Sequence, residues 1–103
     1  GPEGIRSIVT SKMFDKLKTL NLCRNILGDE GVIIIAKENK LPKLEELDLA
    51  WNDVGDKGAE ALSSSDQTPN LVAVYMDNNL VSAETREASK QQANFKKLQS
   101  LNL

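Results

Sequence analysis

A period of 27 residues runs through the chain and constrains its fold more than any other feature of the sequence. An apolar motif begins at positions 17, 44, 71 and 98, with no insertion between the copies. An asparagine keeps the same spacing at Asn25, Asn52 and Asn79. Repeats of this length are single supersecondary units that bury their apolar faces by stacking on their neighbours. The sequence therefore predicts an array of stacked coils.

Each repeat begins with a pattern that is typical of a short strand. In the second copy, Leu47 and Leu49 alternate with the polar residues Glu46 and Asp48. Such alternation indicates a strand with one buried face. The turn that follows the strand leaves backbone groups unpaired, and asparagine side chains bond such groups well. We therefore expect the three asparagines to form a buried ladder along the array.

The second half of each repeat is predicted to be helical. Asp29 and Asp56 stand at the expected helix starts, where carboxylates accept backbone N–H bonds and favour the helix dipole. Ser82 is the expected cap in the third copy, where Ala83 replaces the aspartate. The expected helices cover residues 28–40, 55–66 and 82–94, with a partial helix at 4–13.

The third helix is the least regular part of this pattern. Ser89 stands where Ile35 and Leu62 stand in the other copies, so we expect this helix to pack weakly. The polar segment 63–68 is expected to fray. Two aromatic residues share the repeat position of Leu41 and are expected in the core: Phe14 and Phe95.

The repeat resembles the leucine-rich repeat family, whose pattern L-x-x-L-x-L-x-x-N-x-L is followed by a helix. The first copy matches it with Leu17, Leu20, Leu22, Asn25 and Leu27. The length of the repeat and the G-D-x-G string resemble the ribonuclease-inhibitor-like subclass. The resemblance implies a right-handed α/β solenoid, with short parallel strands on the concave side and helices on the convex side. It divides residues 1–103, a single segment, into a partial repeat 3–16, repeats 17–43, 44–70 and 71–97, and a last strand 98–103.

The chain begins inside one repeat and finishes on the strand of another. Solenoids usually carry polar caps, because each repeat buries its face on its neighbours. We therefore expect a segment of a longer array. The alternative is a complete protein whose ends are capped by oligomerisation.

Composition excludes several classes of function. The net charge is −2, from 13 basic and 15 acidic residues, which disfavours nucleic-acid binding by phosphate neutralisation. No apolar run approaches the ~20 residues of a membrane span, so no membrane insertion is expected. Histidine is absent, which removes histidine-activated nucleophiles and histidine metal sites. We expect no catalytic residues, no cofactor, no metal and no small-molecule substrate.

The lone cysteine, Cys23, favours a reducing compartment because it cannot form an internal disulfide. The expected location is intracellular, in the cytoplasm, or in a host cytoplasm if the chain belongs to a bacterial effector. Without a histidine to activate it, Cys23 is expected to be a small unreactive thiol. The G-D-E-G and G-D-K-G strings do not match a phosphate-binding loop, and their glycines suit turns and close helix packing.

The candidate binding residues lie at strand positions that point away from the predicted core. Trp51 and Tyr75 are the only tryptophan and tyrosine, and both residue types are enriched at binding hot spots. Acidic neighbours give this surface a negative bias, which implies a partner protein with a basic patch. The full set is Trp51, Tyr75, Asp48, Asp77, Glu46, Arg24, Asn21 and Asn78. The alternatives are that Trp51 packs on its own turn, that Tyr75 shields a strand, and that the acids form a solvated face.

These features predict a non-catalytic module that binds a partner protein through its concave face, as an inhibitor or as an effector-type recognition domain. Fold analogy alone does not select one member of the family. Two alternatives remain open. One is a regulator of an enzyme, such as a GTPase activator. Such regulators use an exposed arginine or asparagine to stabilise the reacting groups of the nucleotide, and Arg24 is a poor candidate for that role. The other is an architectural spacer.

Overall fold

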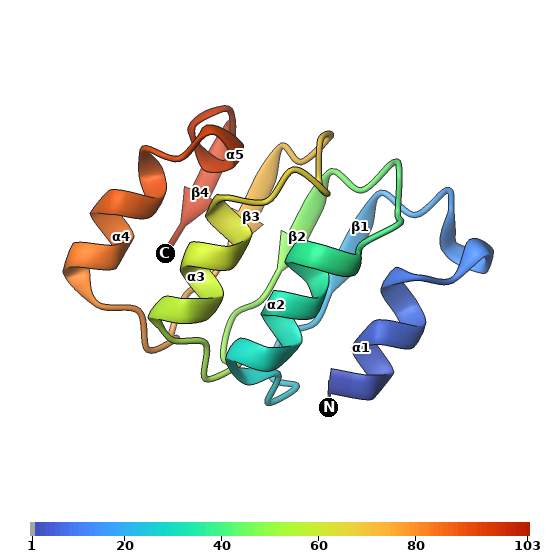
Figure 1. Cartoon of the computed structure of the whole chain (residues 1–103), viewed down its shortest axis with the longest axis horizontal. Coiled ribbons are helices and arrows are strands. Elements are labelled where there is room, and N and C mark those ends of the chain that lie inside the picture. The colour runs from blue at the N-terminus through green and yellow to red at the C-terminus, as the bar shows by residue number, and fades with distance from the viewer. Residues whose placement is uncertain (1) are drawn as a thin grey trace.

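The computed structural model describes residues 2–103, and these residues form successive coils of strand and helix. Figure 1 shows the strands following one another across the molecule, with the helices in front of them in the same order. In chain order the elements are α1 (Pro2–Val9), the 3-10 turn η1 (Lys12–Phe14), β1 (Thr19–Asn21), α2 (Gly28–Glu38), β2 (Glu46–Asp48), α3 (Asp56–Ser63), β3 (Ala73–Tyr75), α4 (Ala83–Lys90), α5 (Ala93–Lys96) and β4 (Ser100–Asn102).

The four strands form one parallel sheet in the order β1-β2-β3-β4. Each strand residue pairs with the residue 27 positions further along, so that Leu20 pairs with Leu47, Leu47 with Val74, and Val74 with Leu101. The offset between paired strand residues therefore equals the 27-residue period of the sequence. This mixed α/β arrangement agrees with the predicted solenoid.

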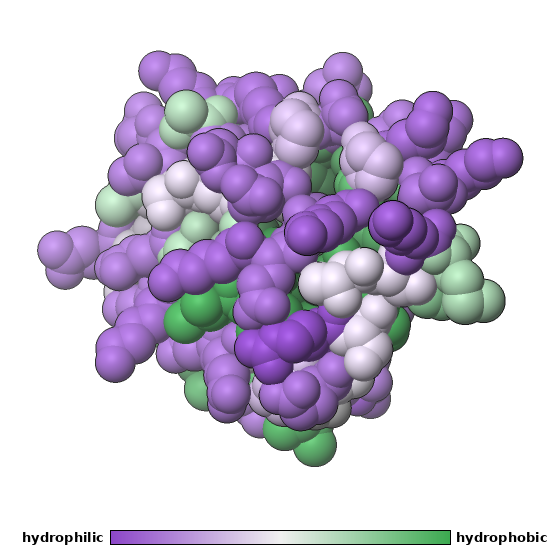
Figure 2. Space-filling view, turned by 45° about the vertical axis from the view of Figure 1, so that its right-hand side comes forward, coloured by the Kyte–Doolittle hydropathy of each residue, from purple (hydrophilic) through white to green (hydrophobic). Residues whose placement is uncertain are grey.

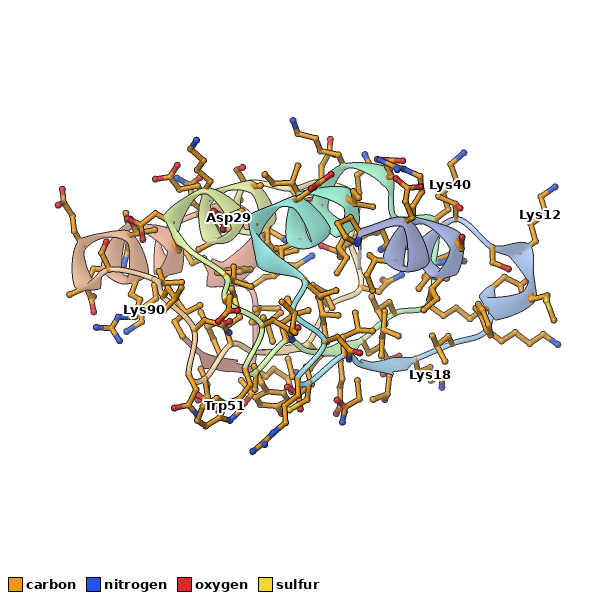
Figure 3. All side chains as sticks on the ribbon, turned by 90° about the horizontal axis from the view of Figure 1, so that it is seen from below. Lys12, Lys18, Asp29, Lys40, Trp51 and Lys90 are labelled. Carbon is orange, nitrogen blue, oxygen red and sulfur yellow. The ribbon has the colours of Figure 1, made fainter. Side chains whose placement is uncertain are left out.

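The core lies between the sheet and the helices, which form separate layers in Figure 3. From the strands and turns, the most deeply buried apolar side chains are Leu44, Leu47, Leu49, Val54, Val74 and Met76. From the helices they are Val32, Ile35, Ala59 and Leu62. Burial of apolar area at about 25 cal/mol per Å² is the main stabilising contribution in such a layered fold.

The asparagine ladder is present, and its members differ in burial. Asn52 is fully buried: its Oδ1 accepts hydrogen bonds from the backbone N–H groups of Asn25 and Leu27, at 2.9 and 3.2 Å. Its Nδ2 donates to the carbonyl of Leu22 at 2.8 Å, so this side chain joins its own coil to the preceding one. Asn79 makes the equivalent bonds to Asn52 and is half-buried.

Asn25 departs from the expected burial and is exposed. Its Nδ2 donates to the carbonyls of Leu22 and Cys23 in its own coil. The difference has a simple cause: within residues 2–103, no strand and turn precede β1, so the side chain has no earlier turn to reach.

The aspartates at the helix starts cap the helix of the following coil. The Asp29 Oδ1 atom, in the first turn of α2, accepts hydrogen bonds from the backbone N–H groups of Gly55 and Gly58 at the start of α3. A side chain at Gly58 would clash with this carboxylate, since an added Cβ would lie 2.8 Å from Oδ1. Glycine at this position therefore permits the contact.

Asp56 repeats this arrangement one coil later. Its Oδ1 accepts from the backbone N–H of Ser82 at 2.8 Å, and its Oδ2 accepts from the Ser82 hydroxyl at 3.0 Å. These bonds to Ser82 lower the pKa of the Asp56 carboxyl, because they favour its charged form. The Ser82 Oγ also accepts from the backbone N–H of Thr85, which confirms Ser82 as the cap of α4.

The third predicted helix, 82–94, is wrong as a continuous element. The structure has α4 over Ala83–Lys90 and a separate short helix, α5, over Ala93–Lys96. Asn94 is buried and donates to the carbonyl of Leu62 at 2.8 Å, while Phe95 is buried in the core as expected. These inward contacts compete with a straight continuation of α4. The other helices are shorter than predicted at their C-terminal ends: α1 ends at residue 9, α2 at residue 38 and α3 at residue 63.

One further expectation fails. Phe14 is 39% exposed rather than buried, because it lies in η1 at the outer side of the first coil, where no other coil of residues 2–103 covers it. Segment 63–68 leaves the helix after Ser63, in line with the expected fraying, but it is held by contacts: Thr68 is 1% exposed, and the Ser65 hydroxyl donates to the carbonyl of Ala36 in the neighbouring coil. Among the described residues, no helix has the length and apolar character needed to cross a bilayer.

Candidate functional site

The candidate site lies on the outward side of the sheet, which we call the strand face. It consists of the strand side chains that point away from the helices, together with the residues that follow each strand. The sheet register arranges these side chains in rows that run across the strands. Parallel strands lie about 4.8 Å apart, so neighbours within a row are close enough to act together.

The most distinctive feature of the strand face is a stacked pair. The guanidinium of Arg24 lies over the ring of Trp51, with its central carbon 5.1 Å from the ring centroid. This distance is within the range of a cation–π interaction, which contributes about 0.5–1 kcal/mol at an exposed site. Trp51 remains 50% exposed, so the contact with Arg24 leaves much of the indole accessible.

The backbone holds this pair at the end of the strands. Arg24, Trp51 and Asn78 occupy the same repeat position, and all three have positive φ, at 62°, 58° and 59°. A left-handed conformation is unusual for a residue as large as tryptophan. It recurs here because the same turn follows β1, β2 and β3, and it places the three residues side by side on adjacent turns.

A row of polar and aromatic residues crosses the middle of the strand face. Asn21 pairs with Asp48, Asp48 with Tyr75, and Tyr75 with Asn102. The Asp48 Oδ1 accepts from the backbone N–H of Ala50 at 3.0 Å, and the Asn21 Oδ1 accepts from that of Cys23 at the same distance. Asp48 and Tyr75 are half-buried, whereas Asn21 and Asn102 are exposed.

The remaining predicted residues lie around these two features. Glu46 is exposed one row away, between Thr19 and Ala73, and Asp77 is exposed two residues after the end of β3. The carbonyl of Asp77 accepts from the backbone N–H of Trp51 at 3.1 Å, so these two residues are neighbours. The structure therefore brings the predicted binding residues onto one face. Within residues 2–103, acidic and cysteine side chains form no cluster able to hold a metal ion.

The stacking of Arg24 on Trp51 was not predicted from the sequence, although the two residues lie 27 positions apart. Asn102 joins the central row from β4, at the outward-facing position that alternation along the last strand predicts. Ala73 is 3% exposed despite its outward strand position. Its methyl group is small and stands between Glu46 and Ser100 in the sheet register.

The chain was compared with models of known protein families. A model described as a leucine-rich repeat matches residues 16–36 and 40–63, which contain β1, α2, β2 and α3. These two segments are leucine-rich repeats. A search of the curated proteins found no match.

Leucine-rich repeats are commonly protein–protein interaction modules and are generally non-catalytic. The matched repeats contain the Arg24–Trp51 pair and the Asn21–Asp48 pair of the strand face. The strands that carry Tyr75 and Asn102, β3 and β4, lie outside the matched residues.

Proposed function

We propose that this leucine-rich repeat protein binds a partner protein through the strand face and performs no catalysis itself. The observation that carries the proposal is the half-exposed Trp51 with Arg24 stacked on it. Tryptophan and arginine are enriched among residues that dominate binding energy. Here each limits the conformational freedom of the other, which reduces the ordering cost of binding.

The partner that we propose carries a basic patch. Glu46, Asp48 and Asp77 supply negative charge on the strand face, while the positive charge of Arg24 faces the ring of Trp51. Complementary charge mainly orients the partner and speeds association, whereas Trp51 supplies apolar contact area. An inhibitor and an effector-type recognition domain are both compatible with such a surface.

The proposal extends to the class and location of the protein. The 27-residue spacing supports the ribonuclease-inhibitor-like subclass of leucine-rich repeats. An intracellular location is supported by Cys23, which is a free, half-buried thiol. A free thiol is better preserved in a reducing compartment.

The test is a comparison of matched variants in a capture experiment followed by affinity measurement. Proteins retained by the wild type are identified by mass spectrometry, and the strongest is purified and titrated. Trp51→Ala is expected to weaken its binding about tenfold or more, which corresponds to about 1.4 kcal/mol. Asp48→Asn keeps the acceptor for Ala50, as Asn21 shows at the same repeat position, and is expected to slow association at low salt.

The control for charge is Glu60→Gln, because Glu60 is exposed on α3 in the helix layer. A partner that binds the Trp51→Ala variant as tightly as the wild type contradicts the proposal. So does a partner whose affinity responds to Glu60→Gln and not to Asp48→Asn.

A further inference from the structure

Basic residues gather in the connections that lead into β1 and β2, where Glu46 is the adjoining residue of the strand face, since its backbone N–H donates to the carbonyl of Lys18 at 2.9 Å. We call this set the lysine corner; it comprises Lys12, Lys16, Lys18, Lys40 and Lys43, all of them exposed. Figure 3 shows Lys12, Lys18 and Lys40 toward one end of the molecule, Lys40 on the side of the helices and Lys18 on the side of the sheet, with Trp51 and Lys90 toward the other end. The connections that carry these lysines contain two acids, Asp15 and Glu45. A positive patch therefore exists in a protein whose net charge is −2.

None of the five lysines is neutralised within the described residues. The ion pairs of residues 2–103 join Arg6 to Glu3 and Glu38, and Lys90 to Glu87. Lys97 shares a repeat position with Lys16 and Lys43, but its ammonium group is bound within the protein. The Lys97 ammonium donates to the carbonyls of Thr68 and Pro69, at 3.1 and 2.8 Å, and burial lowers its pKa.

A groove of about 510 Å³ opens beside this corner, where the chain enters the strands. Lys18 and Lys43 line it together with Glu45, Asn70 and Val72. Its walls thus offer two ammonium groups, one carboxylate, one aliphatic side chain and the amide of Asn70, whose Nδ2 also donates to the carbonyl of Pro42 at 2.6 Å. Figure 2, which turns this end of the molecule forward, shows a mostly hydrophilic surface with small, separated apolar areas.

We propose that the lysine corner and its groove bind an acidic polypeptide segment, at a surface that adjoins the strand face at Glu46 and lies away from Trp51. Carboxylates of such a segment would be held by Lys18 and Lys43, and Asn70 would bond its backbone or side-chain groups. Glu45 favours this occupant over a uniform polyanion, such as a nucleic acid or an anionic membrane. A polypeptide places its carboxylates at discrete positions and so avoids Glu45, whereas a uniformly charged surface presents repulsive charge to it.

The test uses a fluorescein-labelled peptide of five Glu-Ser repeats, with a peptide of five Gln-Ser repeats as the neutral control. Fluorescence anisotropy at low salt is expected to show binding of the acidic peptide and not of the neutral one. The double variant Lys18→Glu/Lys43→Glu is expected to weaken binding at least tenfold. The matched control Lys57→Glu/Lys96→Glu makes the same change in net charge at exposed lysines elsewhere and is expected to change affinity by less than twofold.

Several outcomes would overturn this proposal. One is an equal loss of binding in the two double variants, which would indicate a response to net charge alone. Another is the absence of binding to the acidic peptide by the wild type. A third is tighter binding of a 20-nucleotide single strand or of phosphatidylserine vesicles that depends on Lys18 and Lys43. Trp51→Ala is expected to leave peptide binding unchanged, so this test and that of the strand face can fail independently.

Discussion

The helices of the first and third complete coils occupy the same place in the fold and are built differently. α2 has eleven residues and buries Val32, Ile34 and Ile35, whereas α4 has eight residues and buries Thr85 and Ser89. The strands beneath these helices, β1 and β3, nevertheless belong to one regular sheet. The strand and its asparagine turn therefore determine the path of the coil, while the helix layer tolerates polar substitution.

The looser packing of the third coil has a visible consequence. A groove of about 310 Å³ lies between α3 and α4, lined by side chains that include Ser63, Ala88 and Ser89. The hydroxyl of Ser89 is buried without a hydrogen-bond partner among the described residues. Small polar residues have replaced the apolar volume that Ile35 and Leu62 supply in the other coils.

The largest expected effect is a loss of stability on removal of the asparagine side chain that joins two coils. Asn52→Ala removes a fully buried side chain that satisfies backbone groups in two coils. We expect a loss of about 3–4 kcal/mol in the free energy of unfolding, because buried groups left unpaired cost about 1–3 kcal/mol each. Asn25→Ala, at the exposed member of the ladder, is expected to cost about 1 kcal/mol or less. Urea denaturation measures both losses of stability. Similar losses for Asn52→Ala and Asn25→Ala would contradict the inference that the buried asparagine turn determines the path of the coil.

The next effect concerns the helix layer of a well-packed coil. Leu62→Ala removes buried apolar volume from α3. We expect a loss of about 2–3 kcal/mol, from lost burial and the cavity that remains. The denaturation midpoint should fall while its slope stays constant. A loss below about 1 kcal/mol would show that the second coil is as tolerant as the third.

The same repeat position in the third coil should respond in the opposite direction. Ser89→Ala removes a buried hydroxyl that has no partner and places a better helix former in α4. We expect a gain of about 1 kcal/mol in the free energy of unfolding. A loss of stability on this substitution would indicate that the Ser89 hydroxyl is hydrogen-bonded in solution.

The smallest effect is a dependence on pH at the start of α4. The folded pKa of Asp56 lies below its ordinary value because Ser82 hydrogen-bonds the carboxylate. Its stabilising contribution is therefore complete above the ordinary aspartate pKa of about 3.9 and is lost as the pH falls through the lower, folded value. Denaturation at neutral pH and near pH 3 should show a smaller difference for Asp56→Asn than for the wild type. Asp53→Asn, at an exposed residue, should behave as the wild type does.

Much of this architecture was predictable because the period of the sequence equals the register of the sheet. The strands, the asparagine turn and the cap at Ser82 all follow from residues that recur 27 positions apart. The break after Lys90 was not predictable from the period, because it depends on the contact of Asn94 with Leu62 in another coil. The exposure of Phe14 likewise depends on which coils surround it.

The binding residues show the same division. Their shared face could be predicted from alternation along each strand, whereas the stacking of Arg24 on Trp51 depends on the left-handed turn that both residues adopt. The positions of individual lysines were plain in the sequence. Their gathering beside a groove emerged only when the connections before β1 and β2 were placed in space.

The bonds between coils point in two directions, and this matters for exchanging repeats between proteins. Asn52 reaches back to the turn before it, and Asp29 reaches forward to the helix after it. A recombination point at any repeat boundary severs one kind of bond or the other. Chimaeras that receive both partners of each bond together should fold. A single repeat transferred alone would lose its hydrogen bonds to the neighbouring coils.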